Sequence, residues 1–318
     1  MDYRLGAAAL AAGHGLSAYD SLGSTNTEAL ERGRAGETHP TWVVARRQAA
    51  GRGRRGNAWA SLPGNLTTSL LLGVDDVDPS AVATLGFVAG VALVAALDGV
   101  DRQPTGDRTL RSPPRPHPEV PARSGGLEGG LQDPRSELEA SFEAAYAAPQ
   151  DEGAGGMTKW SRPAVRLKWP NDVLVDGAKL AGILLEAETV PNGRRCVVIG
   201  VGVNVAATPE GLPYPATCLR QCGHGASAEV VFEALSDSMA EALEVWDRGR
   251  GFTAIRARWL GAAAGIGAPV SVRTGRETVQ GIFETIDEAG RLVVRSDDGM
   301  RRTVTAGEVH FGTAATAA

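Results

Sequence analysis

The sequence predicts an α+β protein in which a region of mixed helices and strands is followed by a small antiparallel β-barrel. Two observations support this prediction. Residues 1–100 and 164–260 change repeatedly between helical and extended patterns of apolar residues. Residues 269–311 instead alternate apolar and polar residues between turn signals, as about five short strands would. A chain of 318 residues is long enough for two folded units, which we place at 1–264 and 265–318.

Four elements are expected in the first hundred residues. Residues 24–36 are typical of a helix that ends in glycine, because Thr25 and Glu28 form a capping-box pattern. Residues 41–46 and 65–74 are apolar runs typical of strands. A second helix should begin at Pro79, because an aspartate precedes this proline.

The helix that begins at Pro79 could also be a membrane span, because residues 80–97 carry no charge over 18 positions. However, this stretch is rich in Ala and Gly, and aspartates flank it on both sides. No secretory signal is evident at the N-terminus. Three cysteines are an odd number and too few for a disulfide scaffold. We therefore expect a buried core helix in a soluble cytoplasmic protein with no membrane partner.

The composition changes between residues 101 and 164, where 17 of 64 residues are Gly or Pro. Such a stretch buries too little apolar surface to offset the entropy lost on ordering. We expect a disordered insertion here, with a short helix possible at residues 135–148. After it, residues 164–188 should form three strands joined by turns at 170–172 and 176–177. Another strand is expected at 196–205, and helices at 228–248 and 252–260.

The segment RRQAAGRGRRGNAW, residues 46–59, concentrates five arginines in a chain of net charge −5. No Asp or Glu lies between Glu37 and Asp75, so these arginines have no acidic neighbours in the sequence. The glycines permit close backbone approach, and arginine is the forked donor for carboxylate or phosphate. A focused positive charge suits a small anion. A solvated basic loop and an RNA-binding segment remain alternative interpretations.

The segment RLKWPNDVLVDGAKLAGILLE, residues 166–186, could bring Lys168 and Lys179 to one pocket, because two tight turns separate them. Asn171 and Asp172 could equally be turn residues bonded to their own backbone. Gly182 within a strand indicates close approach of a ligand or of another backbone. GVGVNV, residues 200–205, lacks the third glycine of a dinucleotide fingerprint, and the sequence has no P-loop. If a nucleotide binds, neither a dinucleotide fingerprint nor a P-loop holds it.

Taken in order, these segments resemble the biotin–protein ligase family. The matching stretches are STN (24–26), GRGRRG (51–56), KWPND (168–172), KLAGIL (179–184) and GVGVN (200–204). The resemblance implies a mixed-sheet catalytic domain of the class II synthetase type, followed by an SH3-like β-barrel. Two features depart from the family pattern. Asn57 replaces the usual basic residue after GRGRRG, and the 101–164 insertion replaces a short link.

The resemblance also implies site residues. It assigns Lys179 and Arg54 to catalysis and Asp172 to the metal. It assigns to biotin Ser24, Thr25, Asn26, Gln48, Arg52, Gly53, Arg54, Lys179 and Gly182. It assigns to the nucleotide Arg52, Arg55, Trp59, Lys168, Asn171 and Asn204.

The implied activity is ligation that uses ATP and Mg²⁺, with biotin as substrate and a biotin carboxyl carrier domain as protein partner. ATP would convert the biotin carboxylate to biotinyl-5'-AMP, from which the biotinyl group passes to a carrier lysine. Only 23 residues precede Ser24, too few for a helix-turn-helix domain, so we expect no repressor function and no nucleic-acid partner. Two alternatives stay open. One is a lipoate or octanoate ligase on the related fold, and the other is an RNA-binding module that uses the arginine loop.

Overall fold

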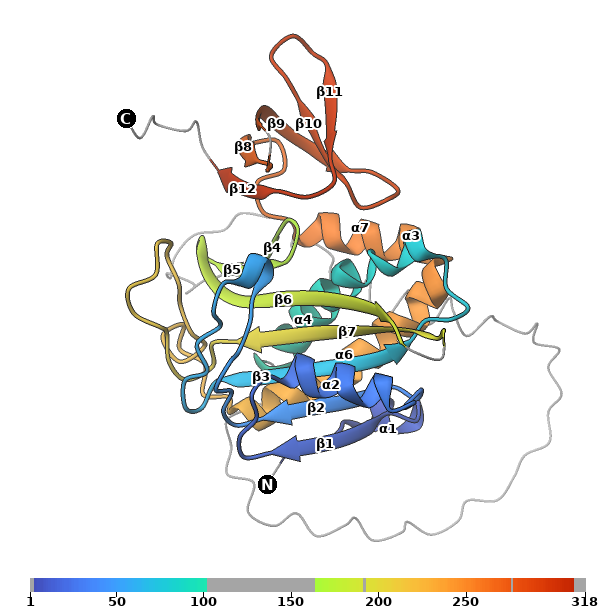
Figure 1. Cartoon of the computed structure of the whole chain (residues 1–318). Coiled ribbons are helices and arrows are strands. Elements are labelled where there is room, and N and C mark those ends of the chain that lie inside the picture. Colours follow the sequence, from blue (N-terminus) through green and yellow to red (C-terminus); the bar gives the residue numbers. More distant parts are fainter. Residues whose placement is uncertain (1–2, 102–163, 191–192, 276, 312–318) are drawn as a thin grey trace, which may run out of the picture. The chain divides into compact units, whose positions relative to one another are not determined.

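The structure, a computed structural model, describes residues 3–101, 164–190, 193–275 and 277–311 (Figure 1). Within these ranges the strands form two sheets, of seven and five strands. The expected insertion, apart from its first and last residues, lies outside the described residues, as does the short helix expected at 135–148. The division at residues 264 and 265 stays a prediction.

The seven-stranded sheet has the order β1-β2-β3-β7-β6-β5-β4. Its β1 and β2 are parallel and every other pair is antiparallel, so the expectation of a mixed sheet is confirmed. Central β3 and β7 are almost wholly buried, which explains why both are nearly continuous apolar runs in the sequence. The strands are β1 (Gly15–Tyr19), β2 (Thr41–Ala45), β3 (Leu66–Gly73), β4 (Val165–Lys168), β5 (Asp172–Val175), β6 (Ala178–Thr189) and β7 (Arg195–Val203).

Helices cover both faces of this sheet. Helix α2 (Thr25–Arg34) lies on one face, and α4 (Leu85–Asp101) and α6 (Ala228–Trp246) lie together on the other (Figure 1). Short α3 (Pro79–Val82) precedes α4, and α7 (Phe252–Ala262) packs on α4. The stretch Pro79–Val100 is long and apolar enough to cross a membrane, but 72% of its most apolar window is buried inside the protein. It therefore forms part of the core, as its flanking aspartates indicate.

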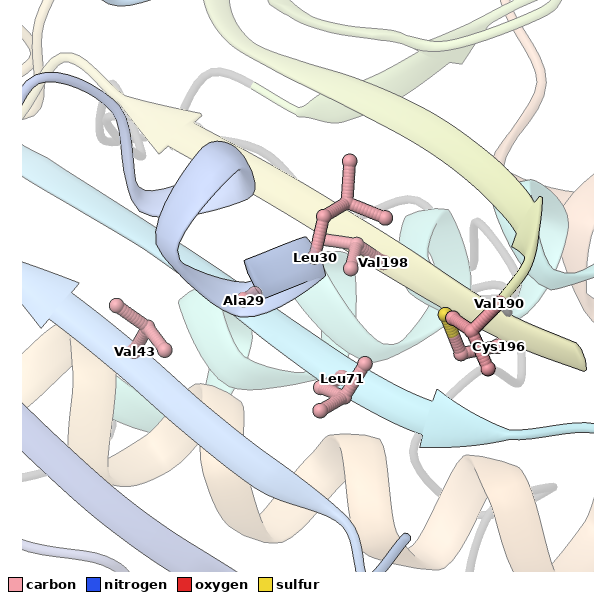
Figure 2. Close-up of a cluster of buried hydrophobic side chains, with 7 residues drawn as sticks. All are labelled: Ala29, Leu30, Val43, Leu71, Val190, Cys196 and Val198. Carbon is pink, nitrogen blue, oxygen red and sulfur yellow. The ribbon is translucent and has the colours of Figure 1, made fainter. Parts of the chain in front are cut away.

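Helix α2 is held to the sheet by one apolar cluster, shown in Figure 2. Ala29 and Leu30 of the helix face Leu71 of β3 and Val198 of β7, and all four are at most 9% exposed. Burying a leucine side chain contributes about 1.5–3 kcal/mol. The side chain of Ser24 caps the helix by accepting from Thr27 N at 3.4 Å. The predicted capping box of Thr25 and Glu28 is therefore wrong, and Glu28 Oε1 instead accepts from Tyr19 and Arg32. Cap and cluster together fix where the first turn of α2 stands above the sheet.

The second sheet is antiparallel, with order β11-β10-β9-β8-β12, which agrees with the predicted number of strands. Side-chain hydrogen bonds from Trp169 and Arg256 connect it to the preceding elements. Trp169 Nε1 donates to the Gly290 carbonyl at 3.0 Å, and Arg256 Nε donates to the Ile286 carbonyl at 2.7 Å. The strands are β8 (Pro269–Arg273), β9 (Thr278–Ile286), β10 (Leu292–Arg295), β11 (Arg301–Val304) and β12 (Glu308–Phe311).

Two N-terminal elements are not predicted by the sequence: the short helix α1 (Ala7–Ala11) and the edge strand β1. The residues of β1 are all half-buried, so they show no apolar–polar alternation. Its extended form comes from pairing with β2, a contact between distant residues that no local pattern encodes.

Candidate functional site

A cavity of about 680 Å³ lies on the face of the sheet that carries α2. Its walls come from the first turn of α2, the arginine loop at residues 51–59, the β4–β5 turn, β6, β7 and the segment 307–311. Every residue that the sequence assigns to the site lines this cavity except Asn204. Lys168 and Lys179 are both among the lining residues, as the two turns between them predict.

One end of the cavity is a polar network anchored on buried Ser69. Its single hydroxyl hydrogen is shared between Thr25 Oγ1 at 2.7 Å and Asn26 Oδ1 at 2.6 Å. Gln48 Oε1 accepts from the Thr25 amide at 2.7 Å and from the Thr25 hydroxyl at 3.0 Å. Asn26 Nδ2 donates to Glu186 Oε2 at 2.6 Å. Hydroxyl and amide groups are therefore held in fixed orientations around this end of the cavity.

The floor of the cavity is built from glycines on adjacent strands. Gly202 of β7 pairs with Gly182 of β6, and Gly200 lies two residues before Gly202 on the same face. A Cβ at Gly202 would lie 2.3 Å from the Trp59 ring, and one at Gly200 would lie 2.2 Å from Asn26 Oδ1. The glycines are thus required because side chains from α2 and from the arginine loop lie directly on the strands. Trp59 Nε1 is buried there with no hydrogen-bond partner among the described residues.

The arginine loop is a tight turn closed by its own backbone. Arg52 and Ala58 form an isolated antiparallel bridge, and Gly53 N donates to Asn57 O at 2.7 Å. Arg55, at φ 57°, has a left-handed backbone. Arg54 is half-buried and donates to Asn171 Oδ1 at 3.2 Å, and burial lowers its pKa. Arg52 donates to Thr27 Oγ1 at 3.1 Å and pairs with Glu186.

Lys179 forms an ion pair with Asp172, with Nζ 2.7 Å from Oδ1 and both side chains about one-fifth exposed. A bulge in the β5–β6 pairing shifts the register near Lys179, and its Cε lies 3.4 Å from a Cβ position at Gly182. The backbone of Lys179 pairs with residues 215–217, and its Nζ lies 5.4 Å from the centre of the Tyr214 ring. The lysine thus reaches the glycine floor from beside a carboxylate and an aromatic ring.

Lys168 enters the same cavity from the end of β4. Burial lowers its pKa; the charge of Lys179 also lowers it, while Asp172 acts in the opposite direction. Its Nζ lies 5.8 Å from the centre of the Phe311 ring. Neighbouring Asn171 donates through Nδ2 to the Ile183 carbonyl at 2.6 Å. Lys168, Lys179 and Arg54 therefore meet at this end of the cavity, near the two carboxylates of Asp172 and Glu308. Three positive charges against two negative ones suit an anionic ligand.

Asn204 lies apart from the cavity lining and is only 3% exposed. Its Oδ1 accepts from Asn65 Nδ2 at 3.4 Å, and its Nδ2 donates to the Thr217 carbonyl at 3.1 Å. In this arrangement the amide joins the end of β7 to the segment after Tyr214. The contact with adenine assigned to Asn204 stays a prediction.

The expected magnesium would need carboxylate ligands in the cavity. Asp172 and Glu308 line it, and the described part of the chain gathers no cluster of three metal-ligating side chains. Mg²⁺ commonly binds through one or two carboxylates together with substrate phosphates. Asp172, adjacent to both lysines, therefore fits a metal that arrives with a nucleotide.

Four residues in or beside the cavity lie outside the sequence motifs. Ser69 carries a signal that could have been used, because it is a polar residue within a buried apolar strand. Glu186 follows the KLAGIL motif by two residues. Tyr214 and Phe311 line the cavity from distant segments, and only the tertiary structure brings them there.

Comparison with known proteins places these features in a family. The chain matches the model of the Biotin/lipoate A/B protein ligase family over residues 19–125 and 131–204. Residues 265–312 match the model of the Biotin protein ligase C terminal domain. A relative from Paracoccus denitrificans, a biotin–[acetyl-CoA-carboxylase] ligase, is 34% identical over 297 residues, covering 91% of this chain and 97% of the relative.

Solved structures share the fold. A mutant of the biotin protein ligase from Aquifex aeolicus, in complex with biotin, superposes with a TM-score of 0.61 at 20% identity, covering 94% of this chain and 98% of that one. The biotin protein ligase of the same organism in complex with biotin and ATP gives a TM-score of 0.56, with the same identity and coverage. At this identity the likeness concerns the fold alone, and it confirms the predicted α+β class.

Proposed function

Because this chain is an enzyme of the biotin protein ligase family, we propose that it activates biotin as biotinyl-5'-AMP and transfers the biotinyl group to a lysine of a biotin carboxyl carrier domain. The family assignment supports biotin ligation in general. The adenylate route and the carrier are supported by the chemistry of the cavity, by the name of the Paracoccus relative, and by the ATP and biotin bound to the Aquifex protein.

The first step joins two anions. A biotin carboxylate oxygen attacks the α-phosphorus of ATP, an O–P bond forms, and the bond to the β-phosphate breaks to release pyrophosphate. Negative charge concentrates on the phosphate oxygens in the transition state, so fixed cations stabilise it more than the ground state. Lys179, Lys168 and Arg54 supply positive charge at the end of the cavity where the phosphates would bind. Mg²⁺, held beside Asp172, would neutralise further phosphate charge.

Lys179 is suited to the reacting carboxylate and phosphate. Its ion pair with Asp172 holds Nζ over Gly182, beside the ring of Trp59. We assign Arg52, Gly53 and Arg54 to closure over the ligands, and Arg55, Trp59 and Asn171 to the nucleotide.

In the second step a carrier lysine amine attacks the acyl carbon, an amide bond forms and AMP leaves. The mixed anhydride survives between the steps only where water is excluded. The arginine loop supplies that cover, because Arg54 spans from the loop to Asn171 in the β4–β5 turn.

The polar end of the cavity is the observation that carries the choice of biotin. Biotin ends in a urea, with one carbonyl acceptor and two N–H donors. The lipoate ring offers neither. Ser24, Thr25, Asn26 and Gln48 place hydroxyl and amide groups at this end, and each group left without a partner costs about 1–3 kcal/mol.

Titration calorimetry with biotin and with lipoate tests this choice. Two lost hydrogen bonds correspond to about a hundredfold in affinity, so biotin should bind at least about a hundredfold more tightly than lipoate. Adding ATP to the protein with bound biotin should release pyrophosphate. Equal affinity for the two acids, or tighter binding of lipoate, would favour the lipoate ligase alternative.

The RNA-binding alternative places the arginines on an open surface. In the structure Arg54 is half-buried and Arg52 is paired with Glu186. These contacts direct both side chains toward the cavity, which favours a small ligand. RNA binding that weakens steeply with salt, without pyrophosphate release, would support the alternative.

A further inference from the structure

We propose that Glu186 is a positioning residue for the biotin site, acting through Asn26 and Arg52. This inference rests on the proposed function. Glu186 does not line the cavity, whereas both of its partners do. Its Oε2 accepts from Asn26 Nδ2 at 2.6 Å, and its Oε1 lies 3.4 Å from a terminal nitrogen of Arg52. One carboxylate therefore contacts the first turn of α2 and the arginine loop together.

Strand geometry explains why Glu186 reaches both partners. Residues 182, 184, 186 and 188 of β6 share one face of the sheet, the face that α2 covers. Gly182 forms the cavity floor, Glu186 meets Asn26 at the start of α2, and Glu188 pairs with Arg34 at its end. Glu188 thus provides a natural comparison: the same residue type, on the same strand and face, bonded to the same helix but away from the cavity.

The first consequence concerns the orientation of the Asn26 amide. An ionised carboxylate accepts hydrogen bonds and cannot donate them, so Glu186 requires the nitrogen of the amide on its side. Ser69 donates to the opposite oxygen at 2.6 Å. Asn26 is only 6% exposed, and Gly200 provides the space in which its amide lies. Without Glu186, the buried amide loses the contact that distinguishes its two ends.

The second consequence concerns the loop. Arg52 bonds to Glu186 and to Thr27 Oγ1, so it joins the loop to β6 and α2 before any ligand binds. A site whose groups are already in place loses less conformational entropy on binding. Glu186 should therefore increase the affinity for biotin most, because Asn26 is assigned to biotin alone. Its effect on ATP should be smaller, because only Arg52 connects it to the nucleotide.

The test compares Glu186→Ala with Glu188→Ala by calorimetry, using biotin and ATP as separate probes. Losing a charge-assisted hydrogen bond in a partly buried site should weaken biotin binding about tenfold in the Glu186 variant, with a smaller loss of ATP affinity. The Glu188 variant should bind both ligands within about twofold of wild type. Equal effects of the two variants, or equal losses for biotin and ATP, would overturn the proposal.

A merely structural role predicts something different, namely a lower unfolding temperature without a ligand-specific effect. The Glu186→Gln variant keeps the proposal testable if the alanine variant fails to fold. Glutamine keeps the volume and one acceptor for Asn26 but removes the charge that pairs with Arg52. We expect biotin affinity between those of wild type and the alanine variant. Wild-type affinity in a folded glutamine variant would overturn the role of the Arg52 contact.

A double-mutant cycle completes the experiment. If Glu186 acts partly through Arg52, the combined Glu186→Ala and Arg52→Ala variant should lose less biotin affinity than the product of the two single losses. Multiplicative losses would contradict the coupling. Failure of the wild-type protein to bind biotin would instead refute the proposed function, so the two failures are distinguishable.

Discussion

At the scale of single residues, Lys179 is the side chain on which activation should depend most. Its ammonium should interact with the reacting groups most strongly when charge develops on carboxylate and phosphate. We predict that Lys179→Ala reduces pyrophosphate release about a hundredfold or more while biotin affinity falls less than about tenfold. Burst kinetics of pyrophosphate release, with biotin affinity measured separately, checks this. Release close to the wild-type rate would show that the assignment is wrong.

Lys168 gives a prediction about pH. Burial lowers its pKa, so it loses its proton at a lower pH than an ordinary lysine does. If its charge supports nucleotide binding, activity should fall as the pH rises, at a pH below the usual lysine range, which centres at about 10.4. Lys168→Arg keeps the charge and should extend the profile to higher pH.

The measurement for Lys168 is the pH dependence of pyrophosphate release by the two proteins at saturating biotin. The shape of the profile matters more than the level, because the larger guanidinium can disturb packing beside Phe311. Superimposable alkaline limbs would show that Lys168 is not the group that titrates.

At the scale of elements, the arginine loop should retain the adenylate. Arg54→Gly removes the contact to Asn171 and adds backbone freedom, and both changes favour opening. Adenylate should still form, because Lys179 remains, and the released anhydride should biotinylate bystander proteins. The assay mixes the variant with ATP, biotin and albumin and probes the albumin with streptavidin.

Arg55→Gly is the matched comparison for this assay. The backbone at Arg55 is already left-handed, a conformation that glycine adopts without strain, and no hydrogen bond or ion pair holds its side chain to the described residues. We expect it to label albumin less than Arg54→Gly does. If albumin stays unlabelled while the Arg54→Gly variant still makes adenylate, the loop assignment is refuted.

The helices and strands also show which elements local sequence patterns can predict. Helix α2, apolar β3 and β7 and the tail strands follow directly from residue spacing, although the residue that caps α2 is Ser24 rather than Thr25. The first strand does not, because its half-buried residues depend on pairing with β2. Among the site residues, those within contiguous motifs line the cavity, with the exception of Asn204. Tyr214 lines it from a distant segment, and Ser69 and Glu186 contact its lining residues through long-range hydrogen bonds that a linear motif does not contain.

At the scale of the whole molecule, the insertion offers a prediction. All described site contacts involve residues 24–69 and 166–311. Replacing residues 104–160 by a flexible linker of about ten residues should therefore leave ligation within about threefold of wild type, because a Gly- and Pro-rich connection contributes little to the core. Unfolding temperature and pyrophosphate release measure the outcome. A loss of folding or of most activity would show that the insertion packs or acts.

The central claim is that this molecule joins biotin to a carrier lysine, and mass spectrometry of the carrier tests it most directly. The protein is incubated with ATP, biotin and a purified biotin carboxyl carrier domain, with lipoate replacing biotin in a parallel sample. The account predicts a carrier heavier by one biotinyl group, dependent on ATP, and no change with lipoate. A carrier of unchanged mass in the presence of active protein, or one that gains a lipoyl group instead, would contradict it.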